Sequence, residues 1–159
     1  MPMPVLLDNT VLSNFALVRQ LQLLQQILEH RAATVSQVVA EYERGVALHR
    51  VPATSWEWLK IYSLTSDELS LYQALLRRVN AGEAACLAVA YTHKLSLVTD
   101  DRDARQIAVQ YGIAKTGTIG VLVEAVHRNV LTLSQANEIL RHMIAVGYRC
   151  PLDKLDTLL

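Results

Sequence analysis

Acidic residues fall at four separate points of the chain, and together they could build one site. Asp8 follows a short apolar run, and Glu41 and Glu83 each lie within a helical pattern. Three more aspartates occur within four residues, where an apolar run stops and a helical pattern starts. An all-carboxylate site suits a hard divalent cation such as Mg²⁺ or Mn²⁺ rather than zinc. The candidate metal ligands are Asp8, Glu41, Glu83, Asp100, Asp101 and Asp103.

A site of this kind performs recognisable chemistry. One or two divalent cations activate water and stabilise an in-line displacement at phosphorus. Clustered carboxylates repel one another, so without a cation the cluster raises some pKa values or destabilises the fold. The sequence contains no Ser-His-Asp or Gly-x-Ser-x-Gly pattern, and its five histidines are scattered without metal spacing. The acids therefore indicate hydrolysis by water rather than by a nucleophilic side chain.

Each acid also has an ordinary structural explanation. Asp8 and Asp100 can cap helices, Asn80 and Glu83 fit a capping box, and Glu41 can be a solvated helix residue. A helix start uses one capping side chain and tolerates one more negative charge, which leaves the third aspartate of the cluster unexplained. The joint placement of the acids favours a site over separate caps.

Short apolar runs alternate with helical patterns along the chain, which predicts a parallel sheet covered by helices on both faces. The fold class is therefore α/β, a three-layer α/β/α sandwich with a central parallel sheet, followed by C-terminal helices. In such sheets function collects at the carboxyl ends of the strands, where Asp8 and the aspartate cluster fall. We expect strands within residues 4–7, 32–35, 56–64, 95–99 and 113–117.

Two helix starts carry a capping-box pattern besides the one at Asn80. Thr34 with Gln37 predicts the start of a helix after the second strand, and Thr65 with Glu68 predicts another. Gly45 is expected to mark an end or a kink in the first of these helices. The acid at Glu41 would then lie on that same helix.

Composition limits the function classes further. The 159 residues fit one domain, and 15 basic against 15 acidic residues give a formal net charge of zero. Binding of nucleic acid would therefore need a local basic surface. Cys86 and Cys150 match no metal spacing and are expected to be reduced thiols. The amino-terminal residues do not resemble a signal peptide and no run reaches membrane-spanning length, so we expect a cytoplasmic protein.

Four motifs follow one another along the chain: LLDNTVLSNF, VVAEYERG, NAGEAACLAVA and LVTDDRDARQIA. In this order they resemble the motifs of the PIN domain family. The resemblance covers residues 5–126, and the Gly-Glu-Ala stretch and TGTIGVL look closest to the branch that includes toxins of VapBC-like toxin–antitoxin pairs. It implies a metal-dependent ribonuclease, commonly a homodimer, often held inactive by a small antitoxin protein.

Carried over residue by residue, the resemblance places the catalytic and metal-binding acids at Asp8, Glu41, Glu83 and Asp101. Asp101 is preferred to Asp100 because the common pattern is Thr, any residue, then Asp. Asp100 and Asp103 remain further metal ligands in this assignment. The sequence departs from the family pattern at Asn9, Thr10 and Ala104. The residues expected to bind RNA are Thr10, Arg102 and Arg105, with Lys94 and Lys115 as further basic candidates.

Two other functions were weighed against the nuclease. A receiver-like phosphoacceptor switch also has acids at strand ends, but it needs an acidic pair after the first strand, where only Asp8 stands. A catalytically inactive PIN-like module that binds a partner protein would need none of the acids. We expect residues 1–130 to form the nuclease domain and residues 131–159 a helical extension that packs on it. Alternatively, the extension covers a dimer or antitoxin surface.

Overall fold

The computed structural model describes residues 3–159, and its centre is a sheet of five parallel strands in the order β3-β2-β1-β4-β5. In the register, Leu6 of β1 lies between Ala33 of β2 and Leu97 of β4. The predicted α/β class with a parallel sheet is confirmed. The strands are β1 (Val5–Leu7), β2 (Ala32–Val35), β3 (Lys60–Tyr62), β4 (Ser96–Val98) and β5 (Lys115–Thr116).

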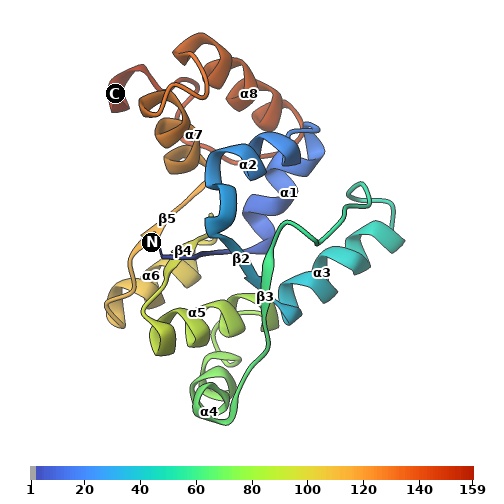
Figure 1. Ribbon diagram of the computed structural model, residues 1–159, viewed down its shortest axis with the longest axis vertical. Helices are drawn as coiled ribbons and strands as arrows, with labels where there is room; N and C mark the ends of the chain where they lie inside the picture. The colour runs from blue at the N-terminus through green and yellow to red at the C-terminus, as the bar shows by residue number, and fades with distance from the viewer. Residues whose placement is uncertain (1–2) are drawn as a thin grey trace.

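Helices cover both faces of this sheet, as expected for a three-layer sandwich. In Figure 1, α2, α7 and α8 lie on one side of the strands, and α4, α5 and α6 lie on the other. Helix α3 stands at one end, where it contacts both α1 and α5. The helices are α1 (Asn9–Leu17), α2 (Leu21–Leu28), α3 (Ser36–Ala47), α4 (Ser66–Leu75), α5 (Ala81–His93), α6 (Arg102–Gln110), α7 (Thr118–His127) and α8 (Leu133–Ala145), with short 3-10 turns η1 (Glu29–Arg31) and η2 (Asp156–Leu158).

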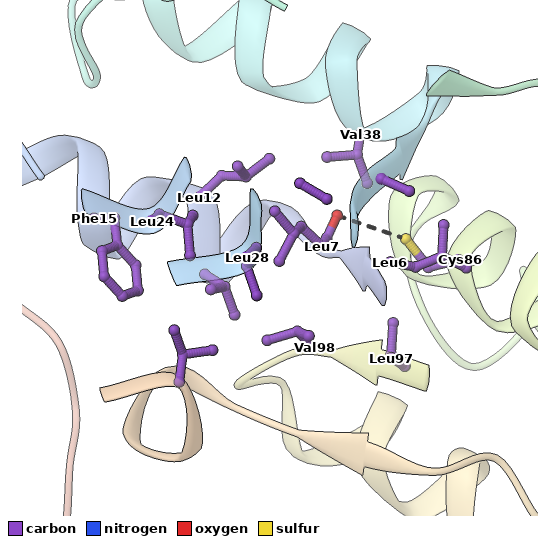
Figure 2. Close-up of a cluster of buried hydrophobic side chains, with 14 of the residues drawn as sticks. Leu6, Leu7, Leu12, Phe15, Leu24, Leu28, Val38, Cys86, Leu97 and Val98 are labelled. Atoms are coloured by element: carbon purple, nitrogen blue, oxygen red, sulfur yellow. Dashed lines mark hydrogen bonds between the residues drawn. The ribbon is translucent and has the colours of Figure 1, made fainter. Parts of the chain in front are cut away.

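The core lies between the layers and fixes the central strands. Leu6 and Leu7 of β1 are completely buried, and side chains from α1, α2, α3 and α5 pack around them (Figure 2). The thiol of Cys86 donates a long hydrogen bond, 4.0 Å, to the main-chain oxygen of Leu7 (Figure 2). Cys86 and Cys150 are both unpaired thiols. Because β1 is held from both faces, the residue that follows it has a well-defined position.

Two of the three predicted capping boxes are present. Asn80 and Glu83 start α5, and Thr65 and Glu68 start α4, with side chain and backbone bonded reciprocally in each case. The capping box predicted at Thr34 is wrong, because Thr34 is still within β2 and its hydroxyl donates to the Leu7 oxygen at 2.7 Å. The fully buried hydroxyl finds that carbonyl on the neighbouring strand instead of a helix N–H.

Two further expectations about this part of the chain are corrected. Gly45 does not end α3, because the helix continues to Ala47. The third strand is shorter than expected, since Trp56 and Trp58 lie in the loop before β3. The Trp56 indole donates to Glu43 at 2.6 Å and packs edge-on against the Tyr42 ring. Trp56 and Trp58 are partly buried against the core by side-chain packing, not by a strand.

The C-terminal segment packs on the same core. Leu140 and Met143 of α8 are fully buried, and α8 contacts α7 and α1. The boundary at residue 130 stays a prediction. None of the helices formed by residues 3–159 combines the length and the apolar character needed to cross a membrane.

Candidate metal centre at the carboxyl edge of the sheet

The order of the strands brings Asp8 and the aspartate cluster to one place. Strands β1 and β4 are neighbours, so the residues that follow them meet at the carboxyl edge of the sheet. The chain leaves β1 for β2 on one side and reaches β4 on the other, which makes this edge a topological switch point. The segments that follow β1 and β4 therefore lie next to each other at this edge.

Asp8 is the most buried acid of the site, with 1% of its surface exposed. Its carboxylate accepts a hydrogen bond from the Thr99 hydroxyl at 2.6 Å, and others from the Asn9 N–H at 2.8 Å and the Thr10 hydroxyl at 3.3 Å. Burial raises the pKa of Asp8, these three bonds act in the opposite direction, and the charge of Asp101 raises it slightly. Hydrogen bonds thus orient the Asp8 carboxylate, and the negative charge of Asp101 disfavours its charged form.

Glu83 comes from the first turn of α5, the buried helix on one face of the sheet. The side chain is 7% exposed and accepts hydrogen bonds from the Asn80 N–H at 3.2 Å and the Asn80 amide at 3.1 Å. Burial raises the pKa of Glu83 to about 7, and the charges of Asp8, Asp101 and Glu41 add to the rise. The capping box is therefore present, but its hydrogen bond from Asn80 does not cancel the rise in pKa that burial and the neighbouring acids cause.

Glu41 reaches the same place from α3. Its Oε2 atom is buried and has no hydrogen-bond partner, while the Asn80 amide donates to the other oxygen at 3.4 Å. Burial and the charge of Asp8 raise the pKa of Glu41, and Arg44 lowers it. A Cβ atom at position 82 would lie 2.7 Å from Oε2, too close for an ordinary contact. The glycine therefore provides the space that this oxygen occupies.

Asp101 completes the group as the N-cap of α6, accepting from the Ala104 N–H at 2.8 Å. Its charge acts on both Asp8 and Glu83, which places it beside them. The charges of Asp101 and Glu41 thus both act on Glu83, and Asp8 interacts with Asp101, Glu41 and Glu83.

Asp100 points away from this group. Its carboxylate accepts from the Asn14 amide at 2.9 Å, from the N–H and hydroxyl of Thr118, and from the Tyr148 hydroxyl at 3.4 Å. The structure therefore brings Asp100 to α1, α7 and the segment after α8. Its N–H donates to the Thr10 hydroxyl at 3.1 Å, which links the two sets of carboxylates.

The other residues expected at the site lie either on α6 or at the opposite end of β4. Asp103 and Arg102 are exposed in the first turn of α6, and Arg105 is partly exposed one turn later. Among residues 3–159, none of these three forms an ion pair. Lys94 precedes β4 and lies at its opposite end, so the expectation that it flanks the acids is wrong.

The acids of the site have the ligand chemistry that a divalent cation needs, but not a closed arrangement. Within residues 3–159, no three Asp, Glu, His or Cys side chains form a group tight enough to hold a metal ion as they stand. Three features nevertheless fit such an ion: the donors are all carboxylate oxygens, they raise one another's pKa values, and the buried Glu41 Oε2 lacks a partner. The residues present fit Mg²⁺ or Mn²⁺ in chemistry.

Several contacts that complete the site are not predicted by the sequence. Asn80 bridges Glu41 and Glu83, Asn14 holds Asp100, and Gly82 makes room for Glu41. Thr99 was expected only as part of a motif, and its bond to Asp8 appears once β1 and β4 pair. These partners depend on tertiary contacts, which spacing along the chain does not show.

The comparison with protein families agrees with this geometry. A family model described as a PIN domain matches residues 4–159, nearly the whole chain. No curated protein matches the sequence.

Proposed function

The chain belongs to the PIN domain family, whose members are generally nucleases, and on this premise we propose that it is a metal-dependent ribonuclease. The substrate is RNA, the bond hydrolysed is a phosphodiester, and the cofactor is Mg²⁺ or Mn²⁺. The enzyme is an endoribonuclease in this proposal, and water is the nucleophile.

One observation carries the proposal: four acids from distant parts of the chain lie at the same edge of the sheet, where they disfavour one another's charge. Asp8, Glu41 and Glu83 all have raised pKa values, and the charge of Asp101 contributes to two of them. Mutual repulsion of this kind destabilises a folded protein unless a ligand of opposite charge offsets it. A divalent cation is the ligand that suits these oxygens.

The four acids have distinct tasks in this proposal. Asp8 is the most firmly oriented ligand, because Thr99, Asn9 and Thr10 donate to it from three directions. Glu41, Glu83 and Asp101 supply the remaining protein oxygens. A cation bound among them would lower the pKa of water and neutralise charge that develops on the phosphate.

Glu41 has a further advantage as a ligand. Its buried Oε2 atom has no hydrogen-bond partner and can bind a cation without breaking a hydrogen bond. The Asp8 carboxylate, by contrast, already accepts a hydrogen bond from Thr99. Asp103 is exposed beside Asp101 and stays a predicted additional acid at the mouth of the site. Asp100 is the least suited of the predicted ligands, because four donors already occupy its carboxylate.

Binding of RNA needs positive charge near these acids, since the chain has no net charge. Arg102 and Arg105 on α6 are accessible and free of ion pairs among residues 3–159, so they can contact phosphates beside Asp101. The Thr10 hydroxyl lies between Asp8 and the Asp100 N–H and would orient water or a phosphate oxygen.

The biological role that we propose is the toxin of a toxin–antitoxin pair, acting as a homodimer and inhibited by a small antitoxin protein. The support is the resemblance of the motifs, above all the TGTIGVL segment, which begins at β5 and runs into α7. Expression in a bacterial host should arrest growth with the wild-type protein and not with Asp8→Asn. Light scattering of the purified protein measures the mass of the assembly.

The nuclease function is tested by cleavage of RNA in Mn²⁺, with and without a chelator. Cleavage that needs the metal supports the proposal. RNA that stays intact under all conditions would favour the alternative, a PIN-like module that binds a partner protein without catalysis.

A further inference from the structure

A hollow of about 350 Å³ opens directly beside the acids. Its walls come from the first turns of α1, at Asn9 and Ser13, and from the C-terminal half of α3 with the loop that follows. Helices α1 and α3 lie side by side at this end of the molecule (Figure 1). Glu41 forms part of the wall, and Asn9 is the residue directly after Asp8. The hollow thus adjoins the proposed metal centre at Glu41.

Two guanidinium groups line this hollow, those of Arg44 and Arg50. Neither forms an ion pair or a side-chain hydrogen bond within residues 3–159, although Arg31 and Arg128 elsewhere in the fold each pair with a glutamate. Arg44 lies one helical turn after Glu41 and its charge acts on that carboxyl group. Two positively charged side chains therefore line the hollow next to Glu41.

The rest of the lining is suited to a nucleotide. Leu48, which is 60% exposed, and Val51 form an apolar side. Ser13 and Asn9 contact only each other through their side chains, at 3.5 Å, so both can still bond to a ligand. A volume of about 350 Å³ is at the lower end of the range for small-molecule sites and can hold a unit of nucleotide size.

We propose that this hollow is a subsite for the RNA nucleotide next to the bond that is cut. Arg44 and Arg50 bind its phosphate, the base lies against Leu48 and Val51, and Asn9 and Ser13 donate or accept hydrogen bonds. The inference rests on the proposed ribonuclease function, because it takes the neighbouring acids as the place of cleavage. Arginine suits the task, since its planar fork binds phosphate oxygens in pairs.

The test measures binding separately from cleavage. The probe is a fluorescein-labelled single-stranded RNA of ten nucleotides with random sequence, followed by anisotropy in a chelator at several salt concentrations. The variant is Arg44→Gln with Arg50→Gln. The control, Arg19→Gln with Arg141→Gln, removes the same charge from exposed positions in other elements. All four side chains are exposed, so folding should be unaffected, and circular dichroism checks this.

The subsite predicts a loss of affinity of about tenfold or more in the Arg44–Arg50 variant and less than about threefold in the control. The slope of log K against log salt should fall by about 0.7, because the two arginines bind one phosphate and each phosphate contact to a single strand contributes about 0.7. Arg44→Lys with Arg50→Lys should recover most of the slope but only part of the affinity, since lysine keeps the charge and loses the paired contact.

Equal weakening in variant and control, an unchanged salt slope, or no binding of the probe by the wild type would each overturn the subsite. Cleavage in Mn²⁺ is measured on the same samples. If the wild type binds through the arginines but never cleaves, the subsite stands and the ribonuclease function fails. If the wild type cleaves and the arginine variant binds as well as the control, the subsite alone fails.

Discussion

The Thr99 hydroxyl donates a 2.6 Å hydrogen bond to the Asp8 carboxylate, and both side chains are completely or almost completely buried. This bond joins the carboxyl ends of β1 and β4, the two neighbouring strands that deliver the acids of the site. It fixes Asp8 where burial and the charge of Asp101 disfavour the charged form of its carboxyl group.

The two adjacent aspartates should respond differently to removal of their charge. Asp100→Asn weakens the contacts to Asn14, Thr118 and Tyr148, so we expect the free energy of unfolding to fall by about 1–3 kcal/mol. Affinity for Mn²⁺ should be largely kept. Asp101→Asn should do the opposite, since asparagine is also a good N-cap. Urea unfolding and metal titration of both variants measure this, and an exchange of the two results would reverse the assignment.

The metal-free protein should lose stability as the pH rises through neutrality. The folded-state pKa of Glu83 is about 7 against 4.5 for an unperturbed group. A raised pKa stabilises the fold fully below pH 4.5, and this contribution disappears as the pH passes 7. Glu68 acts outside this window: burial raises its pKa, but hydrogen bonds from Thr65 and His93 lower the net value below 4.5.

The size of this effect follows from the shift. With metal removed by a chelator, we expect the free energy of unfolding to be roughly 1–3 kcal/mol lower at pH 8 than at pH 5. Glu83→Gln should flatten the profile, because glutamine has no charge to gain. A wild-type profile that rises between pH 5 and pH 8 would contradict the electrostatic description of the site.

Divalent metal should stabilise the fold. Mn²⁺ at about 100 times its dissociation constant adds about 2.7 kcal/mol, which raises the melting temperature by roughly 5–10 °C in a protein of this size. The increase should be absent in Asp8→Asn. Differential scanning calorimetry with and without the metal measures it. The same increase in wild type and variant would mean that the metal binds elsewhere.

Gly82→Ala tests the room that Glu41 occupies. The added Cβ would lie 2.7 Å from Glu41 Oε2, so the carboxylate must move, and affinity for Mn²⁺ should fall by about tenfold. Gly45→Ala is the matched control, because its Cβ would meet only Val51, at 3.0 Å. Calorimetric titration compares the two variants. Equal affinity in both would show that Glu41 does not bind the metal.

The sequence predicts the layers and the edge of the sheet at which the acids meet. Alternating apolar runs and helical patterns correctly indicate the parallel sheet, because each buried strand must be covered on both faces. Asp8 and Asp101 can be located this way, since Asp8 follows β1 directly and Asp101 lies three residues after the end of β4. The family assignment is confirmed by the match over residues 4–159.

Other features depend on contacts between distant segments and escape a reading along the chain. The three clustered aspartates look alike in sequence, yet Asp100 bonds to α1 and α7, Asp101 faces the acids and Asp103 is exposed. Their directions are set by the backbone turn after β4. Thr34 has a capping pattern, but its hydroxyl instead donates a hydrogen bond to the carbonyl of Leu7 on the adjacent strand.

The central claim is that the acids around Asp8 form a metal-dependent ribonuclease site. The most direct measurement follows the cleavage of RNA in Mn²⁺ by wild type, by wild type with a chelator, and by Asp8→Asn. We predict cleavage by the wild type alone, with a rate at least about 100-fold above that of the variant, because loss of a ligand costs more than loss of an outer partner. Cleavage by Asp8→Asn at the wild-type rate, or an inert wild type, would contradict the account.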